Sequence, residues 1–422
     1  MDRRTKNVNI FKDSVELMQE NDRLQNAIKE SVKTQKLYLE TTEVVIPGSK
    51  GFNCKTVLST KRSFEAASAY AKAGKKVAVL NFASSTNPGG GVTHGSSAQE
   101  ESLCRCGTLY PCLNIDMMWN EFYKPHRKEE DPLYNDDCLY TPGVIVFKSD
   151  ISFPERMKEE DWYQVDVITC AAPNLRHIPD NMIDLLTRDS HAGSEDNLLY
   201  ELHLRRLEKV FKVAAANGAE ILILGAFGCG AFCNPPAIVA KAFKTVQKKY
   251  ASYFETIEYA IFCGGHETKN YNAFCEVFGA EKIYDLSRFL EAHEKDYQRA
   301  LSEVKAGHKS THWMWYIFPQ IAGLGFSRTA QFYSICDLDE AKAYLRDEVL
   351  AVHMKELCEA LIALKTNDAS QVFGWPDDMK LRSCMTLFEL ADPDQKLFGG
   401  VLDKFFEGKR DENTIKILKN KK

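Results

Sequence analysis

The chain has 422 residues, too many for one ordinary compact domain, so we expect two domains. Its 44% of hydrophobic and 27% of charged residues are typical of a soluble globular protein, and no apolar run approaches the roughly 20 residues that span a bilayer. The net charge of −5, without a long block of one sign, argues against loose, charge-driven binding to DNA or RNA.

Predicted helices and strands alternate along the first two thirds of the chain. Helical spacing of apolar residues predicts helices at 11–36 and 63–74. Continuous apolar runs then predict strands at 75–83, 143–147, 165–173, 220–230 and 259–265, with further helices at 197–219, 235–250 and 270–279. This alternation implies an α/β fold with a mostly parallel or mixed sheet between helices.

The pattern changes near residue 283, where the alternation gives way to helical stretches. We therefore predict an α/β domain with an N-terminal helical extension at 1–282, and a smaller, mainly helical domain at 283–422. The thirteen cysteines are scattered and show no paired zinc-ligand spacing. Buried thiols in a reducing compartment explain them more simply than a metal site, so we expect no metal and a cytoplasmic location, or a nuclear one in a eukaryote. We also expect no cofactor.

Two glycine-rich segments each follow a predicted strand, where ligands bind in such folds. Residues 87–101 read NPGGGVTHGSSAQEE, and residues 225–232 read GAFGCGAF. Glycine has no Cβ, so consecutive glycines let backbone amides approach a phosphate or diphosphate. The second segment is no Walker loop, because no Lys-Ser/Thr pair follows it, and tight turn packing is the alternative explanation for it.

Gln99, Glu100 and Glu101 follow the triple glycine after a seven-residue spacer. Adjacent acids are usually only solvated, but the nearby glycines weaken that interpretation. Two carboxyls beside a sugar can have different roles, since one can stay ionised and hold hydroxyls while the other keeps a proton to donate. Asn81 or Asn87 could orient the loop through its amide, and we favour Asn87 as a turn former.

The segment LNFASSTNPGGGVTHGSSAQEESLCRCGTLYPCL (80–113) resembles the signature of microbial-type poly(ADP-ribose) glycohydrolases. Their signature is a triple glycine, a spacer of six to eight residues, and Gln-Glu-Glu. The resemblance extends through 165–176 and 224–236 to 270–274 and covers roughly residues 40–280. It implies a macrodomain fold, ADP-ribose as the ligand, and hydrolysis of ribose–ribose O-glycosidic bonds in a polymer carried by modified proteins.

The resemblance also implies a role for each motif residue. Glu101 is the expected catalytic acid, which protonates the departing 2′-oxygen and then activates a water, while Glu100 holds hydroxyls of the reacting ribose. Phe227 is expected to pack against the distal ribose, and the amides of 228–232 to hold the diphosphate. The expected substrate contacts are Asn87, Gly89, Gly90, Gly91, Gln99, Gly225, Phe227, Gly228, Cys229, Gly230, Ala231 and Phe232.

Three alternatives remain for this site. A binding module would hold ADP-ribose without cleaving it, and the loss of Glu101 would mark it. A mono-ADP-ribosyl or O-acetyl-ADP-ribose hydrolase differs only in its substrate. A scaffold protein would have no affinity for ADP-ribose.

Segments 309–327, 377–390 and 401–411 resemble a bacterial domain of unknown function with a small, mainly helical fold. They combine aromatic residues with cations, namely His312, Trp313, Trp315 and Tyr316 with Lys309, Lys380, Arg382 and Arg410. One interpretation is a helical core with basic residues that reach solvent. The other is a stacking surface with phosphate-neutralising cations, which predicts a second, nucleotide-like ligand.

Overall fold

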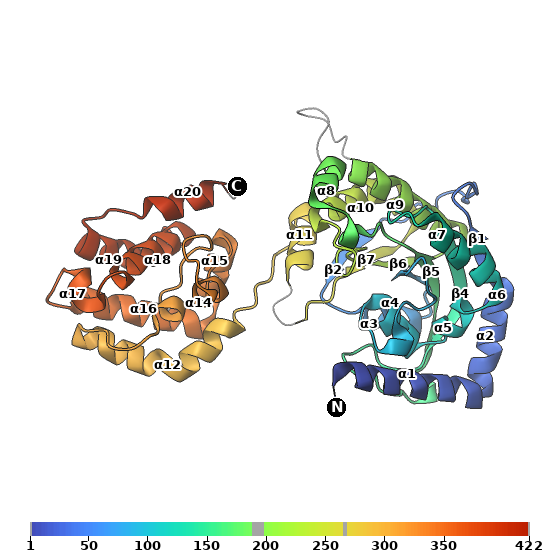
Figure 1. Ribbon diagram of the computed structural model, residues 1–422, viewed down its shortest axis with the longest axis horizontal. Helices are drawn as coiled ribbons and strands as arrows, with labels where there is room; N and C mark the ends of the chain where they lie inside the picture. The colour runs from blue at the N-terminus through green and yellow to red at the C-terminus, as the bar shows by residue number, and fades with distance from the viewer. Residues whose placement is uncertain (1, 188–197, 265–267, 421–422) are drawn as a thin grey trace. The chain divides into compact units, whose positions relative to one another are not determined.

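The computed structural model describes residues 2–187, 198–264 and 268–420 and divides into two compact units, Met1–Glu281 and Lys282–Lys422 (Figure 1). Each unit has a hydrophobic core of its own. The predicted succession of an α/β fold and a smaller helical fold is confirmed. Within the described ranges, no helix has the length and apolar character needed to cross a membrane.

A seven-stranded sheet organises the N-terminal unit, in the order β1-β4-β5-β3-β6-β7-β2. The strands are β1 (Lys36–Tyr38), β2 (Lys55–Ser59), β3 (Val77–Phe82), β4 (Cys138–Val146), β5 (Tyr163–Cys170), β6 (Ile221–Leu224) and β7 (Thr256–Ala260). Only β4 runs antiparallel to its neighbours β1 and β5, whereas all other pairs are parallel. The carboxyl ends of β3, β5, β6 and β7 therefore share one edge of a mixed sheet.

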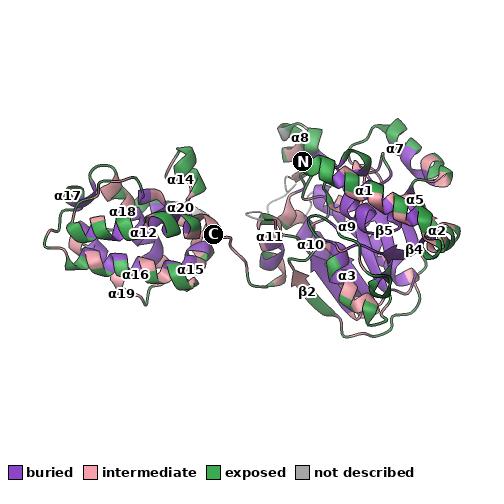
Figure 2. Cartoon of the chain, turned by 90° about the horizontal axis from the view of Figure 1, so that it is seen from below, coloured by how far each residue is buried: buried purple, intermediate pink, exposed green. Residues whose placement is uncertain are grey.

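Helices cover the sheet on both sides (Figure 1). They are α1 (Arg3–Glu20), α2 (Asp22–Thr34), α3 (Ser63–Lys72), α4 (Gln99–Cys106), α5 (Leu109–Leu113), α6 (Asp116–Met118), α7 (Lys124–Glu129), α8 (Asp180–Thr187), α9 (Leu198–Ala216), α10 (Pro236–Tyr250) and α11 (Lys269–Phe278). The central strands are buried on both faces, as Figure 2 shows. This explains why apolar and polar residues do not alternate along their sequences.

The prediction of one helix over residues 11–36 is wrong, because two helices meet at Asn21. This residue has an extended backbone, and its side chain accepts a hydrogen bond from the backbone N–H of Leu24 at 3.1 Å. Asparagine is a strong N-cap, so it ends α1 and starts α2 within one residue. The first helix also begins earlier than predicted, where the Asp2 side chain accepts from the backbone N–H of Thr5.

The C-terminal unit consists of helices, with no strand in its described part. They are α12 (Ser287–Ala306), α13 (Met314–Ile317), α14 (Arg328–Phe332), α15 (Leu338–Arg346), α16 (Glu348–Ala363), α17 (Ala369–Phe373), α18 (Asp377–Ala391), α19 (Lys396–Phe406) and α20 (Glu412–Asn420). Their buried faces meet in one core that includes Trp313, Tyr344 and Phe388.

Candidate active site

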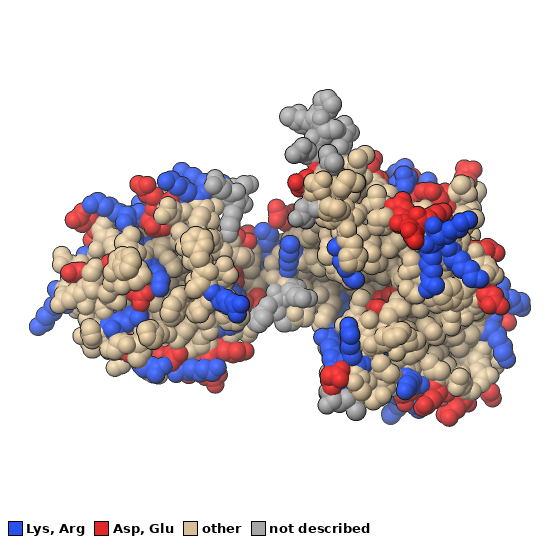
Figure 3. Space-filling model, in the orientation of Figure 1, with Lys and Arg blue, Asp and Glu red and all other residues tan. Residues whose placement is uncertain are grey.

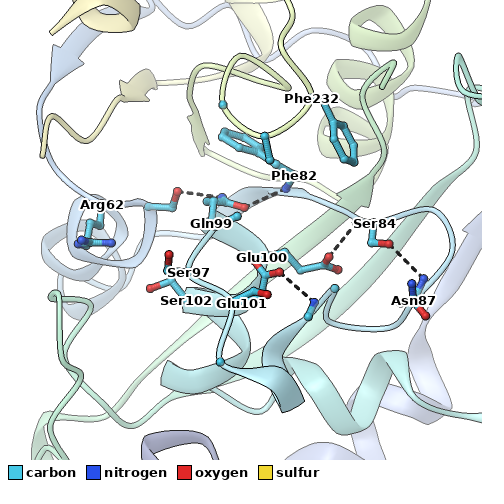
Figure 4. A pocket seen from close by; sticks show the side chains of 18 of the residues that line it. Arg62, Phe82, Ser84, Asn87, Ser97, Gln99, Glu100, Glu101, Ser102 and Phe232 are labelled. Atoms are coloured by element: carbon cyan, nitrogen blue, oxygen red, sulfur yellow. Dashed lines mark hydrogen bonds between the residues drawn. The ribbon is translucent and has the colours of Figure 1, made fainter. Parts of the chain in front are cut away.

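The two glycine-rich segments lie on one pocket because of the strand order. β3 and β6 are parallel neighbours, so the loops that follow them, 83–98 and 225–235, leave the same edge of the sheet. Both loops line a cavity of about 1160 Å³ together with the start of α4 (Figure 4). This volume lies just above the roughly 300–1,000 Å³ of a small-molecule site.

Glu100 and Glu101 lie side by side on the first turn of α4, at the wall of this cavity. Glu100 is 2% exposed, and both its oxygens are engaged: Oε2 accepts from the Ser84 backbone N–H at 2.7 Å, and Oε1 from the Asn81 amide at 3.3 Å. Glu101 is 7% exposed, and its Oε1 accepts from the Gly91 backbone N–H at 2.9 Å. Its Oε2 is buried and has no hydrogen-bond partner within the described part of the chain.

Gln99 fixes the helix that carries the two acids. Its amide nitrogen donates to the Leu80 carbonyl at 2.8 Å and to the Ser63 hydroxyl at 2.9 Å, while its Oε1 accepts from the Phe82 backbone N–H at 2.9 Å. The side chain thus ties α4 to β3 and to the start of α3. Gln99 lines the pocket as well, but these contacts make it a positioning residue.

Burial raises the pKa of Glu100 to about 8, and the neighbouring Glu101 adds to the rise, although the bonds from Ser84 and Asn81 oppose it. This raised pKa favours the protonated form of Glu100, whereas the sequence predicted that the carboxyl which holds hydroxyls stays ionised. A protonated carboxyl can donate a hydrogen bond as well as accept one, which suits a group that holds a sugar hydroxyl.

The raised pKa of Glu100 predicts a loss of stability as the pH rises. Because the folded state favours the proton, this contribution is complete below the ordinary pKa of 4.5 and is lost as the pH approaches about 8. Glu100→Gln has the same shape but does not titrate. Its Tm should fall less than that of the unsubstituted chain across this range. Parallel Tm–pH curves would contradict the raised pKa.

The second glycine loop contributes Gly228, Gly230, Ala231 and Phe232 to the pocket lining. Asn234 closes the loop, because its amide donates to the Gly228 carbonyl at 3.1 Å and to the Pro173 carbonyl at 2.7 Å. Gly228 has a φ of +73°, which only glycine adopts readily.

The prediction that Phe227 packs against the ribose is wrong, because this side chain is fully buried and does not line the pocket. Its ring packs edge-on against the Phe82 ring, with 5.8 Å between the ring centroids. The centroid of the His203 ring lies 6.3 Å from that of Phe227. The aromatic ring that this loop offers to the cavity is Phe232 (Figure 4).

Gly89, Gly225 and Cys229 also lie outside the pocket lining. A Cβ on Gly89 would lie 2.8 Å from the Tyr110 ring, and one on Gly225 would lie 2.6 Å from the Ala260 carbonyl oxygen. These two glycines therefore allow close packing behind the loops. The role of Gly89, Gly225 and Cys229 as substrate contacts stays a prediction.

Packing around Gly228 predicts that Gly228→Val destabilises the fold as well as the site. A new Cβ would lie 2.5 Å from the Ala172 Cβ and 2.6 Å from the Asn234 amide nitrogen. Overpacking of this kind costs about 1–3 kcal/mol, so the Tm should fall. The matched control is Gly230→Val, since a Cβ there meets nothing within 4 Å. Calorimetry that gave both variants the Tm of the unsubstituted chain would contradict the prediction.

Asn81, and not the favoured Asn87, touches the carboxyl pair. Asn81 is fully buried, and its amide bonds Glu100 and the Thr169 hydroxyl. Asn87 is exposed at the pocket rim, where its amide oxygen accepts from the Arg127 guanidinium and its nitrogen donates to the Thr86 hydroxyl at 3.1 Å. It orients the loop, as predicted, through these contacts.

Several lining residues were not predicted from the sequence, namely Arg3, Arg4, Arg62, Phe82, Ser84 and Arg176. Ser84 follows β3 by two residues, and this place at a strand end is a signal that could have found it. The arginines at residues 3, 4 and 62 come from parts of the chain far from both motifs and carry no such signal.

The aromatic and cationic cluster of the C-terminal unit lies largely in its core. Trp313 is fully buried, and its indole nitrogen donates to Glu303 at 2.9 Å. Lys309 and Lys380 both pair with Asp377, at 2.7 and 2.8 Å. The prediction that Trp313 belongs to a stacking surface is wrong, and the interpretation as a helical core is confirmed for this residue.

Arg382 and Arg410 are also engaged within the C-terminal unit. Arg382 donates to the carbonyls of Lys409 and Arg410, at 3.0 and 2.8 Å, and Arg410 pairs with Glu389 at 2.6 Å. Trp315 remains half buried at the surface, with the Lys380 ammonium 4.7 Å from its ring centroid.

Residues 6–149 match the family model of the microbial-type PARG catalytic domain, where PARG denotes poly(ADP-ribose) glycohydrolase. This region is therefore similar to a microbial-type PARG catalytic domain. The match includes the triple glycine and Gln-Glu-Glu but ends before the second glycine loop. Residues 283–418 match DUF1810, a protein family of unknown function.

Solved structures of bacterial PARGs resemble the chain over the same region. PARG from Thermomonospora curvata is 28% identical with a TM-score of 0.56, and the match covers 65% of this chain and 100% of that one. The same enzyme bound to the inhibitor ADP-HPD is 29% identical with a TM-score of 0.56, over 65% of this chain and 99% of that one. PARG from Deinococcus radiodurans in complex with ADP-ribose is 27% identical with a TM-score of 0.52, over 60% and 96%. No curated protein matches the chain.

Proposed function

We propose that the N-terminal unit hydrolyses ribose–ribose O-glycosidic bonds of poly(ADP-ribose) and releases ADP-ribose, with Glu101 as the general acid and base. One observation carries the assignment: of the two adjacent buried carboxyls, Glu100 has both oxygens engaged, whereas Glu101 keeps Oε2 without a partner in the described chain. An unsatisfied buried oxygen is costly and needs an explanation, and a catalytic role supplies one. The PARG-type domain and its likeness to an ADP-ribose complex support the choice of substrate.

The two loops would hold ADP-ribose by its diphosphate and its distal ribose. Backbone amides of 228–232 suit the diphosphate, since they need no side chain to reach a phosphate. Gly90 and Gly91 lie against the carboxyls, so the ribose attached to the scissile bond would sit between these glycines and Glu100. The protonated Glu100 would donate a hydrogen bond to a ribose hydroxyl.

Cleavage then requires Glu101 to donate one proton and to recover one from water. Glu101, as the acid, donates its proton to the 2′-oxygen of the next ribose while the bond from that oxygen to the anomeric carbon breaks, with the electron pair going to the oxygen. A water adds to the anomeric carbon and gives a proton to the Glu101 carboxylate. The products are ADP-ribose and a chain one unit shorter with a free 2′-hydroxyl, and the acid is restored.

The test incubates the full chain with labelled poly(ADP-ribose) and, separately, with mono-ADP-ribosylated protein. We expect ADP-ribose to be released from the polymer. Release from the modified protein alone would favour the mono-ADP-ribosyl hydrolase. Binding of ADP-ribose without release from either substrate would favour a binding module, and the absence of binding would favour a scaffold.

We also propose that the C-terminal unit binds a nucleotide-like ligand through surface tryptophans. Trp375, just before α18, is 84% exposed, and Trp315 is half buried beneath Lys380. An aromatic face near a cation suits a nucleotide base and its phosphate. Calorimetry on the full chain should give two ADP-ribose sites, and one in the Trp315→Ala, Trp375→Ala variant. A single site in both proteins would overturn this proposal.

A further inference from the structure

Three arginines line the same pocket as Glu101 but come from other parts of the fold. Arg3 and Arg4 open α1, and Arg62 immediately precedes α3. The Arg62 guanidinium lies 3.7 Å from the centroid of the Phe262 ring, another residue of the lining. Figure 3 shows Lys and Arg side chains gathered near the start of α1, at the edge of the N-terminal unit.

The start of α1 is fixed against the spacer that separates the triple glycine from Gln-Glu-Glu. The Asn7 amide donates to the Gly95 carbonyl at 3.0 Å in a buried contact. Gly95 has a φ of +77°, and a Cβ on it would lie 2.3 Å from the Arg4 carbonyl oxygen, so the two backbones touch. Further along α1, the Ser14 hydroxyl donates to the Arg105 carbonyl at 2.7 Å. Arg3 and Arg4 are therefore held at the pocket by a docked helix.

Arg62 has partners within the protein. Its guanidinium donates to the Ser152 hydroxyl at 3.5 Å, and its charge opposes the rise that burial causes in the pKa of Asp150, a buried carboxyl that also lines the pocket. None of the three makes an ion pair within 4.0 Å among residues 2–187, 198–264 and 268–420. Arg176, a cation near the second glycine loop, differs because its Nε donates to the Ala231 carbonyl at 2.8 Å. In a chain of net charge −5, three guanidiniums around one cavity, none of them in an ion pair within 4.0 Å among the described residues, favour an anionic ligand.

The arginine side of the pocket and the glycine-loop side are separated by the two acids. Figure 4 shows Arg62 with Ser97 and Ser102 on one side of Glu100 and Glu101, and Ser84, Asn87 and Phe232 on the other. If the glycine loops hold ADP-ribose, the scissile bond lies at Glu101, and the leaving group must extend away from those loops. The lining on the far side of the two acids from those loops includes Arg62 and the spacer residue Ser97.

We propose that Arg3, Arg4 and Arg62 form a subsite for the leaving group, which is a nucleoside diphosphate unit of the polymer. This inference rests on the proposed function and deepens it. The leaving 2′-oxygen belongs to an adenosine ribose whose 5′ end carries the next diphosphate, so a phosphate lies only a few bonds from the cleaved bond. Guanidiniums that pair with this phosphate would select a polymeric substrate over ADP-ribose attached to an uncharged group.

Binding tests the subsite without turnover. In the Glu101→Gln background, a short poly(ADP-ribose) chain should bind at least about fivefold more tightly than ADP-ribose, since exposed charge pairs each contribute modestly. Most of this additional affinity for the polymer should be lost in the double variant Arg3→Gln/Arg4→Gln and, separately, in Arg62→Gln. The Kd of ADP-ribose should stay within about twofold in both. The matched control is Lys12→Gln, an exposed cation on α1 that does not line the pocket.

A second test measures hydrolysis by the same arginine variants with Glu101 unsubstituted. The arginine variants should raise the KM for the polymer about fivefold and leave unchanged the hydrolysis of ADP-ribose joined at its anomeric oxygen to a neutral phenol. The subsite would be overturned if the variants lost activity equally on both substrates. It would also be overturned if they still bound the polymer as much more tightly than ADP-ribose as the Glu101→Gln protein does. If neither substrate is cleaved, the proposed function fails, and the binding arm alone still decides whether the arginines hold the polymer.

Discussion

Replacement of Glu101 by glutamine is expected to lower polymer hydrolysis by at least about 10²-fold, the lower end for the loss of an acid–base group. Glutamine keeps the shape of the side chain and can still accept the hydrogen bond that the Gly91 N–H donates to Oε1. It cannot release and recover a proton at Oε2. The measurement is the rate of ADP-ribose release under saturating polymer, together with the Kd of ADP-ribose.

The Kd of ADP-ribose should stay within a few-fold of the unsubstituted value, because the two glycine loops are untouched. Glu129→Gln, an exposed acid at the end of α7, is the matched control and should keep full activity. A Glu101→Gln protein that turned over at a near-normal rate would remove Glu101 from the reaction.

Replacement of Gly90 by alanine is expected to be almost as damaging, although it adds a single methyl group. Gly90 has a φ of +58°, and a Cβ there would lie 2.6 Å from Glu101 Oε1 and 3.1 Å from Glu100 Oε2. Both carboxyls would have to move. Displacement of a catalytic group by about 1 Å can cost about 10²-fold, so we expect a fall of that size in kcat/KM.

Gly48→Ala is the matched control for Gly90→Ala, since a Cβ on Gly48 meets nothing within 4 Å and this glycine does not have a positive φ. Its kcat/KM should stay unchanged. If Gly90→Ala kept the kcat/KM of the unsubstituted chain, the carboxyls would not depend on the packing of this loop, and the geometry assigned to the site would be wrong.

The centre of the sheet could be predicted from the sequence, and its edges could not. β3, β5, β6 and β7 are buried on both faces, so each appears as a continuous apolar run. β1 and β2 are short and partly exposed edge strands, and their sequences carry no such run. The break between α1 and α2 depends on one N-cap, Asn21, which helical spacing alone does not reveal.

The part of the site that holds the two carboxyls was predictable because its residues lie close together in the sequence. Gly90, Gly91, Glu100 and Glu101 fall within twelve positions and meet through one turn and one helix start. The choice between two rings of the second loop was not predictable, since neighbouring loop residues can face opposite ways. The Phe227 side chain lies in the core and that of Phe232 lines the pocket. Tertiary packing determines which ring faces the pocket.

The identity of the product released from labelled poly(ADP-ribose) tests the central claim most directly. Chromatography of a reaction of the full chain should show ADP-ribose as the only small product, since the proposed role of Glu101 is to protonate a glycosidic oxygen, which leaves the diphosphate intact. The same reaction with Glu101→Gln should show almost none. Nucleotides formed by cleavage of the diphosphate, or equal ADP-ribose release by both proteins, would contradict the account.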